Sequence, residues 1–170
     1  TDKLSMRAIA KAINYSPAGL YEYFGSKEEI IGGVCMVGHK MLKQYMARVD
    51  DALPPFEYMI ELGIAYIEFA RQNSDYFLLM FTNVSSAADF GEMMDETSAF
   101  PLLLNGIARG VKAGVFRTTA DFDVSAMAYM AWSVVHGQAM LQLTFLNDVP
   151  MPFDQLNRGV LERTTRAMML

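Results

Sequence analysis

The chain has 170 residues, of which 52% are hydrophobic and 19% are charged, and its formal net charge is −5. This composition excludes an intrinsically disordered chain, because such chains are poor in apolar residues and rich in charge. A single cysteine excludes an internal disulfide framework, and with no secretory signal and no apolar run of about 18 residues we expect a cytoplasmic protein without a membrane span.

Residues 5–25 predict two short helices separated by a three-residue turn. The first helix begins after Ser5, a typical N-cap residue. Its apolar positions recur at helical spacing, at Met6, Ile9 and Ile13. The second begins with Ser16 as N-cap and Pro17 as its first residue, where the missing proline N–H costs nothing. We expect this helix to extend to about Gly25, with Leu20 and Phe24 on its apolar side.

A long third helix is predicted to begin directly after the second. Ser26 and Glu29 have the spacing of a capping box, in which each residue satisfies a backbone N–H of the other. Apolar residues continue at helical spacing to about Val49. We therefore divide the chain into a helix-turn-helix module at residues 1–45 and a larger helical domain at residues 46–170.

The rest of the sequence predicts five more helices and no convincing strand, which gives an all-α fold. Their expected ranges are 56–73, 75–81, 100–113, 124–146 and 153–168. Ser74 is the expected N-cap of the second of these, and Asp121 or Asp123 that of the fourth. Residues 82–97 are small and polar, and we expect them to form a loop with at most one turn.

Charge is unevenly distributed between the two parts. Residues 1–50 contain seven Lys and Arg against five Asp and Glu, whereas residues 51–170 contain seven against fourteen. A basic part joined to an acidic one is typical of a protein in which only one part meets an anionic polymer.

The two short helices form a helix-turn-helix, whose second helix can enter the major groove of DNA. The hydroxyls of Tyr21 and Tyr23 can donate to phosphates, and Arg7 and Lys27 supply positive charge. Gly19 costs about 1 kcal/mol relative to alanine inside a helix, which we interpret as room for the backbone to approach DNA. The candidate DNA-contacting residues are Ser5, Arg7, Ser16, Pro17, Ala18, Gly19, Tyr21, Tyr23 and Lys27.

The stretch "LSMRAIAKAINYSPAGLYEYFGSKEEII", residues 4–31, resembles the DNA-binding segment of the TetR family of bacterial transcriptional regulators. It carries that family's Leu-Tyr-x-x-Phe core followed by a Lys-Glu-Glu step. The resemblance implies a further helix upstream that this sequence does not include. Without that helix, Met6, Phe24 or Val34 should have an exposed side.

A second stretch, "WSVVHG" at residues 132–137, is similar to the Trp-x-x-x-His-Gly step of the WHG-type C-terminal domain found in this family. The resemblance implies a helical effector-binding domain whose last two helices form a homodimer. Apolar residues on those two helices, expected on the dimer face, are Met127, Met130, Ala131, Val134, Ala139, Leu143, Leu156, Val160, Leu161, Thr164 and Met168.

Aromatic residues and methionines at helical spacing in the second domain belong either to its core or to an apolar effector pocket. The candidate pocket residues are Met59, Tyr66, Phe69, Phe81, Phe100, Tyr129, Trp132, His136 and Met140. His136 is either a titrating group of that pocket or a hydrogen-bonded structural histidine.

Catalysis and metal binding are not expected. Cys35 and His39 are four residues apart but provide only two ligands, which is short of the usual three or four. The sequence shows no nucleophile with its base, and we expect no cofactor and no enzymatic activity. It therefore predicts a DNA-binding regulator, most simply a homodimeric repressor that a small apolar effector releases. The alternative is a helical scaffold whose helix-turn-helix contacts protein; an enzyme using the apolar cavity through His136 is a third reading.

Overall fold

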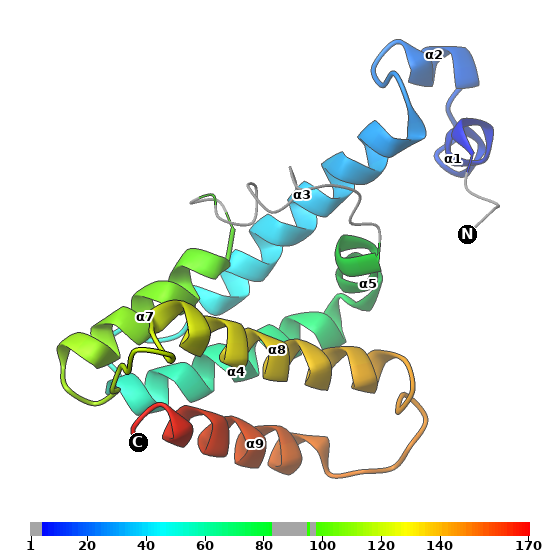
Figure 1. Cartoon of the computed structure of the whole chain (residues 1–170). Helices are drawn as coiled ribbons and strands as arrows, with labels where there is room; N and C mark the ends of the chain where they lie inside the picture. Colours follow the sequence, from blue (N-terminus) through cyan, green and yellow to red (C-terminus); the bar gives the residue numbers. More distant parts are fainter. Residues whose placement is uncertain (1–4, 83–94, 96–97) are drawn as a thin grey trace.

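The computed structural model describes residues 5–82, 95 and 98–170, and within these ranges it contains eight α-helices and no strand (Figure 1). The helices are α1 (Met6–Ala12), α2 (Pro17–Tyr21), α3 (Lys27–Met46), α4 (Pro55–Gln72), α5 (Ser74–Thr82), α7 (Phe100–Lys112), α8 (Val124–Leu143) and α9 (Phe153–Ala167). The predicted all-α class is confirmed.

Helices α1 and α2 lie at one end of α3, away from the other helices (Figure 1). A small apolar cluster holds them together, with Met6, Ala10 and Leu20 buried and Phe24 and Ile30 packed against them. Of the three residues among which an exposed side was expected, Met6 is only 7% exposed and does not provide it. Met6 belongs to the cluster in which α1, α2 and the start of α3 meet. Phe24 and Val34 are half-buried.

Serine side chains begin the first three helices, as predicted. The hydroxyls of Ser5, Ser16 and Ser26 each accept a hydrogen bond from the backbone N–H three residues later, at 2.9–3.2 Å. The second half of the capping box differs from the prediction, because the Glu29 carboxylate accepts from the N–H of Gly25 at 2.7 Å. The carboxylate thus ties the end of the turn after α2 to the first turn of α3.

Helix α3 extends from the small cluster into a bundle formed by the later helices (Figure 1). Its C-terminal half packs against α4 and α5, where Leu42 and Met46 are buried. Helix α4 is the central element and contacts α3, α5, α7, α8 and α9. The largest fully buried side chains are Phe69, Phe77, Phe116, Leu62, Ile107, Met127 and Met168.

Several predicted helix ends differ from the structure, and one open choice between two caps is resolved. Ser74 is the first residue of α5 and not the residue before it, because the Phe77 N–H already bonds to the carbonyl of Asn73. Asp123 caps α8 through the N–H of Ala126 at 2.9 Å, which decides between the two candidate aspartates. Helix α8 ends at Leu143, three residues early. The predicted loop at residues 82–97 falls mostly outside the described residues.

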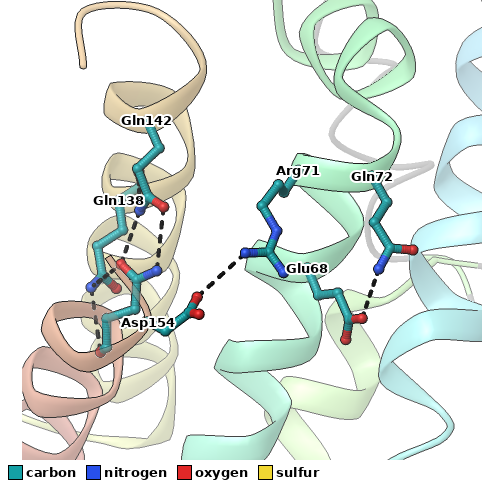
Figure 2. A network of polar contacts seen from close by, with 7 residues as sticks. Glu68, Arg71, Gln72, Gln138, Gln142 and Asp154 are labelled. Atoms are coloured by element: carbon teal, nitrogen blue, oxygen red, sulfur yellow. Dashed lines mark hydrogen bonds and ion pairs between the residues drawn. The ribbon is translucent and has the colours of Figure 1, made fainter. Parts of the chain in front are cut away.

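Helices α8 and α9 lie side by side, and buried amides join them (Figure 2). The Oδ1 atom of Asn157 on α9 accepts from Gln138 at 3.2 Å and from Gln142 at 2.9 Å. Asn157 in turn donates to Gln142 at 3.3 Å. Nearby, Arg71 of α4 and Asp154 of α9 form a 3.4 Å ion pair. Gln138 and Gln142 also donate to the backbone carbonyls of Asn157 and Gln138, so side chains and backbone together join the two helices.

The expected dimer face on α8 and α9 needs correction. Four of its members, Met127, Ala139, Leu161 and Met168, are buried inside this chain's own core. Helix α4 and its neighbours cover that side of both helices. Two other predicted members, Leu156 and Val160, are exposed, and so are Tyr129, Leu141 and Phe145, which the prediction did not include.

Candidate functional site

The helix after the turn is shorter than the sequence predicts. Helix α2 has five residues and its C-cap is Glu22, whose N–H points to the carbonyls of Gly19 and Leu20. Tyr23 follows with a bond to Leu20 only three residues back. The backbone therefore changes to hydrogen bonds between residues three apart, and the α-helix ends at Tyr21. Tyr21, on the helix, is 56% exposed, and Tyr23, beyond it, is 67% exposed.

The structure gives a local explanation for the glycine at position 19, which the sequence did not reveal. A Cβ atom at this position would lie 3.0 Å from both the Ser16 hydroxyl and the Tyr15 ring. The glycine thus allows the turn to close against α2, and close approach to DNA is not needed to explain it. The same turn contains Asn14 in the left-handed region, with φ of 56°, which asparagine tolerates well.

Tyr15 is a surface residue that the sequence analysis missed. It is half exposed, and its ring centroid lies 6.4 Å from that of Tyr23. Tyr15 therefore adds a further phenol beside that of Tyr23. The signal was available in the sequence, since Tyr15 immediately precedes the serine N-cap of α2.

None of the nine candidate DNA-contacting residues is buried. Seven are exposed, and Gly19 and Lys27 are half-buried; the exposed ones are Ser5, Arg7, Ser16, Pro17, Ala18, Tyr21 and Tyr23. Lys27 stands at the N-terminus of α3, 3.5 Å from the Glu28 carboxylate. The surface therefore offers hydroxyls, two cationic side chains and the starts of helices, which are the groups that contact phosphates.

A cavity of about 60 Å³ lies inside the bundle. It receives side chains from α3, α4, α5, α7, α8 and α9. Five of the predicted pocket residues line it, namely Met59, Tyr66, Phe81, Phe100 and Trp132. Phe100 and Trp132 meet edge to face, with ring centroids 6.0 Å apart.

The other four predicted pocket residues lie outside the lining. Phe69 is fully buried in the core, and Met140 packs against that core. Tyr129 is 71% exposed and faces away from the bundle. His136 lies behind the cavity wall, with its ring centroid 4.6 Å from Phe81 and 6.0 Å from Trp132.

The sequence analysis missed the contributions of two helices to the cavity. From α3 come His39, Leu42 and Met46, and from α9 come Leu161, Thr164 and Thr165. Two of these α9 residues belong to the predicted dimer face. Periodicity identified an apolar face on each helix but could not show that these faces surround a gap.

His136 is a hydrogen-bonded histidine, one of the two alternatives considered for it. Its Nδ1 atom lies 2.9 Å from the Tyr66 hydroxyl. Burial raises the pKa of Tyr66 far above its ordinary value, opposed by a hydrogen bond from Trp132, and burial lowers the pKa of His136. An indole N–H is only a donor, so the Tyr66 oxygen accepts from Trp132, while the tautomer of His136 decides which of Tyr66 and His136 donates to the other. Both groups are therefore neutral near pH 7.

Metal-binding clusters and membrane-spanning helices are both absent from residues 5–82, 95 and 98–170. No group of three or more His, Cys, Asp or Glu side chains in these residues is arranged to hold a metal ion. No helix in the same ranges is long and apolar enough to cross a bilayer.

The sequence matches two family models. Residues 1–34 match the model of bacterial regulatory proteins of the tetR family, and residues 59–167 match that of the tetracyclin repressor-like C-terminal domain. The second match covers well over half of the chain and includes the Trp132–Gly137 step. No curated protein matches the sequence.

Solved structures support the same fold. A protein of unknown function from Rhodococcus sp. RHA1 has a TM-score of 0.80 at 20% identity, covering 100% of this chain and 87% of its own. The TetR family transcriptional regulator PfmR from Thermus thermophilus has a TM-score of 0.73 at 23% identity, with coverages of 96% and 85%. A bacterial regulatory protein of the tetR family from Rhodococcus RHA1 has a TM-score of 0.74 at 17% identity, with coverages of 97% and 86%. Identities this low establish only a shared fold, but together with the two family models they show that this chain belongs to the TetR family of DNA-binding transcriptional regulators.

Proposed function

We propose that the protein is a homodimeric repressor that leaves its operator when a small effector occupies the bundle cavity. One observation carries this proposal. Helix α3 contributes His39, Leu42 and Met46 to the cavity wall, and the same helix begins at Lys27, beside the helix-turn-helix. An occupant of the cavity therefore contacts the helix that holds the DNA-binding surface.

The proposed coupling is a difference in effector affinity between two orientations of α3. In the DNA-bound dimer, the two recognition helices must be about 34–36 Å apart, or a multiple of that, to read successive major grooves. A tilt of α3 in each subunit changes this separation. Couplings of this kind are typically about 1–3 kcal/mol, which lowers operator affinity by about 5- to 150-fold.

The outward face of α8 and α9 supports the dimer. Tyr129, Leu141 and Phe145 on and just after α8, with Leu156 and Val160 on α9, are all exposed in the single chain. Gly137 lies on α8 with no other heavy atom of the described residues near its missing Cβ. A second copy related by a two-fold axis would cover these residues with the same residues of its own.

The test is a gel shift of the full-length protein against the DNA upstream of its own gene, at several salt concentrations. Lys27→Ala should weaken binding and reduce the slope of log affinity against log salt by about one unit. Lys112→Ala, an exposed lysine at the end of α7, is the matched control and should leave the slope unchanged.

The same assay separates the repressor from a scaffold that binds protein. Release of the DNA by one compound from a metabolite panel supports the effector mechanism. Specific DNA binding that no change in salt or in Lys27 alters would overturn the assignment of this surface.

A further inference from the structure

We infer that the cavity selects an uncharged effector with an apolar body of about one ring, and that it excludes carboxylates and ammonium ions of the same size. This inference rests on the proposed function, because it names the chemical class of that effector. It follows from the side chains that surround the cavity.

The described lining contains no Asp, Glu, Lys or Arg. Most of the wall is aliphatic or aromatic, with residues such as Leu62, Phe100 and Trp132. The polar groups in the lining are His39, Tyr66, Ser98, Thr164 and Thr165.

Several of these polar groups already have partners within the protein. The Thr164 hydroxyl donates to the carbonyl of Val160 at 3.0 Å, and the Ser98 hydroxyl accepts from the N–H of Phe100 at 3.3 Å. The Tyr66 hydroxyl is hydrogen-bonded to the Nδ1 atom of His136 at 2.9 Å. The cavity therefore offers a neutral ligand a few hydrogen-bonding atoms, and the described part of its wall offers an ion no Asp, Glu, Lys or Arg partner.

An anionic effector meets two obstacles. Its carboxylate would lose most of its water without gaining a Lys or Arg partner from the described lining, and an unpaired buried ion is strongly disfavoured. In addition, residues 51–170 carry seven Lys and Arg against fourteen Asp and Glu, so the domain around the cavity repels anions.

A cationic effector is the stronger competitor, because the rings of Phe81, Phe100 and Trp132 attract cations. Such attraction is weaker than the loss of hydration of a buried ammonium that has no carboxylate partner. The described lining supplies no carboxylate. The neutral ligand is therefore favoured over both ions.

Size sets a second limit. The cavity volume of about 60 Å³ is large for water but small for a drug-sized ligand. Met46 and Met59 in its wall are unbranched and adaptable, so they can make room for a single ring.

The chain has a single tryptophan, Trp132, and it lines the cavity, so its fluorescence reports occupancy directly. The probes are benzyl alcohol, benzoate and benzylammonium, which share one phenyl ring and differ in charge. Titrations of the full chain at pH 7 should give benzyl alcohol an affinity at least tenfold higher than that of either ion. Equal or tighter binding of an ion overturns the inference, as does the absence of any saturable response to benzyl alcohol.

Two variants show whether the response comes from this cavity. Ala131→Leu and Ala99→Leu enlarge lining residues on different segments, and each should weaken benzyl alcohol binding at least tenfold. Ala167→Leu makes the same change at an exposed position of α9 and should bind as the wild type does. Circular dichroism identifies the variants that fold. Unchanged affinity in a folded cavity variant places the binding elsewhere and overturns the inference.

The gel shift separates this inference from the proposed function. If benzyl alcohol binds in preference to the ions but the protein ignores its upstream DNA, the ligand class stands and the repressor fails. If the DNA is bound and a carboxylate or an ammonium compound releases it through the cavity, the repressor stands and the ligand class fails.

Discussion

Two adjacent glycines in α3 lead to a prediction about the helix that joins the two parts of the molecule. In the described structure, a Cβ added at Gly32 or Gly33 would have no other heavy atom within 4 Å. Both residues lie within α3, between Ile30, which packs on the small cluster, and Cys35, which packs on the bundle core. No packing requirement visible in the structure explains them. We expect Gly32→Ala and Gly33→Ala to stabilise the protein.

The magnitude follows from the helical backbone. Alanine loses less conformational freedom than glycine on folding, which is worth about 0.5–1 kcal/mol per position in a helix interior. For a chain of this size, 1 kcal/mol shifts Tm by about 2–4 °C. The Gly33→Ala change should therefore raise Tm by about 1–4 °C, and the double variant by about twice that.

Gly110→Ala provides the contrast, because its Cβ would lie 2.1 Å from the fully buried ring of Phe116. Overpacking of this kind costs about 1–3 kcal/mol, and its Tm should fall. Thermal unfolding followed by circular dichroism, at fixed protein concentration, measures all four variants. A Tm that falls for Gly33→Ala, or that rises for Gly110→Ala, would refute this reasoning about local space. If α3 also bends at these glycines during release, the double alanine variant should need more effector to leave the operator.

Three further predictions concern the larger domain. Asn157→Ala removes the side-chain partner that Gln138 and Gln142 share but leaves each glutamine a backbone carbonyl partner, so urea unfolding should show a loss of about 0.5–1.5 kcal/mol, whereas exposed Gln155→Ala should be near neutral. Burial lowers the pKa of His136 in the folded state, so protonation of this histidine favours the unfolded chain. The stability that neutral His136 contributes is fully present above a pH of about 6.5 and is lost as the pH falls below that value. His136→Gln should therefore flatten the decline of Tm between about pH 7 and pH 5. Val160→Arg on the outward face of α9 should shift the protein from dimer to monomer in analytical ultracentrifugation, while Arg163→Ala, on the next turn, should not; a Val160→Arg protein that remains dimeric excludes this face as the interface.

Local sequence signals predicted the helices well where the side chain and backbone of a few neighbouring residues decide the outcome. The N-caps at Ser5, Ser16 and Ser26 depend only on a hydroxyl and an N–H three residues later, and all three are confirmed. Helix ends depend on more. The end of α2 at Tyr21, short of the predicted end near Gly25, has no such local signal.

The cavity could be predicted only in part, because periodicity shows which side of a helix is buried but not what it is buried against. Phe69 and Phe81 are both aromatic residues on apolar helix faces, yet Phe69 fills the core and Phe81 lines the gap. On α8, Tyr129 and Trp132 are three residues apart, and only Trp132 points inward to the cavity. Whether three helices leave a space between them depends on their crossing angles, which the sequence of one helix does not specify.

The dimer face shows the same limit and also gives evidence for the dimer. Helix α8 has apolar residues on all sides, so the choice of Met127 and Ala139 for its outer face had no directional basis, and the structure places both inside. A helix with apolar residues on every side is normally buried on every side by other parts of the protein. Within the single chain, Tyr129 and Leu141 remain 71% and 50% exposed, which leaves a side of this helix uncovered. Helix α8 lacks a polar face, and for that reason its periodicity could not give a correct prediction. The same property supports the proposal that a second copy of the chain packs on the uncovered side of α8.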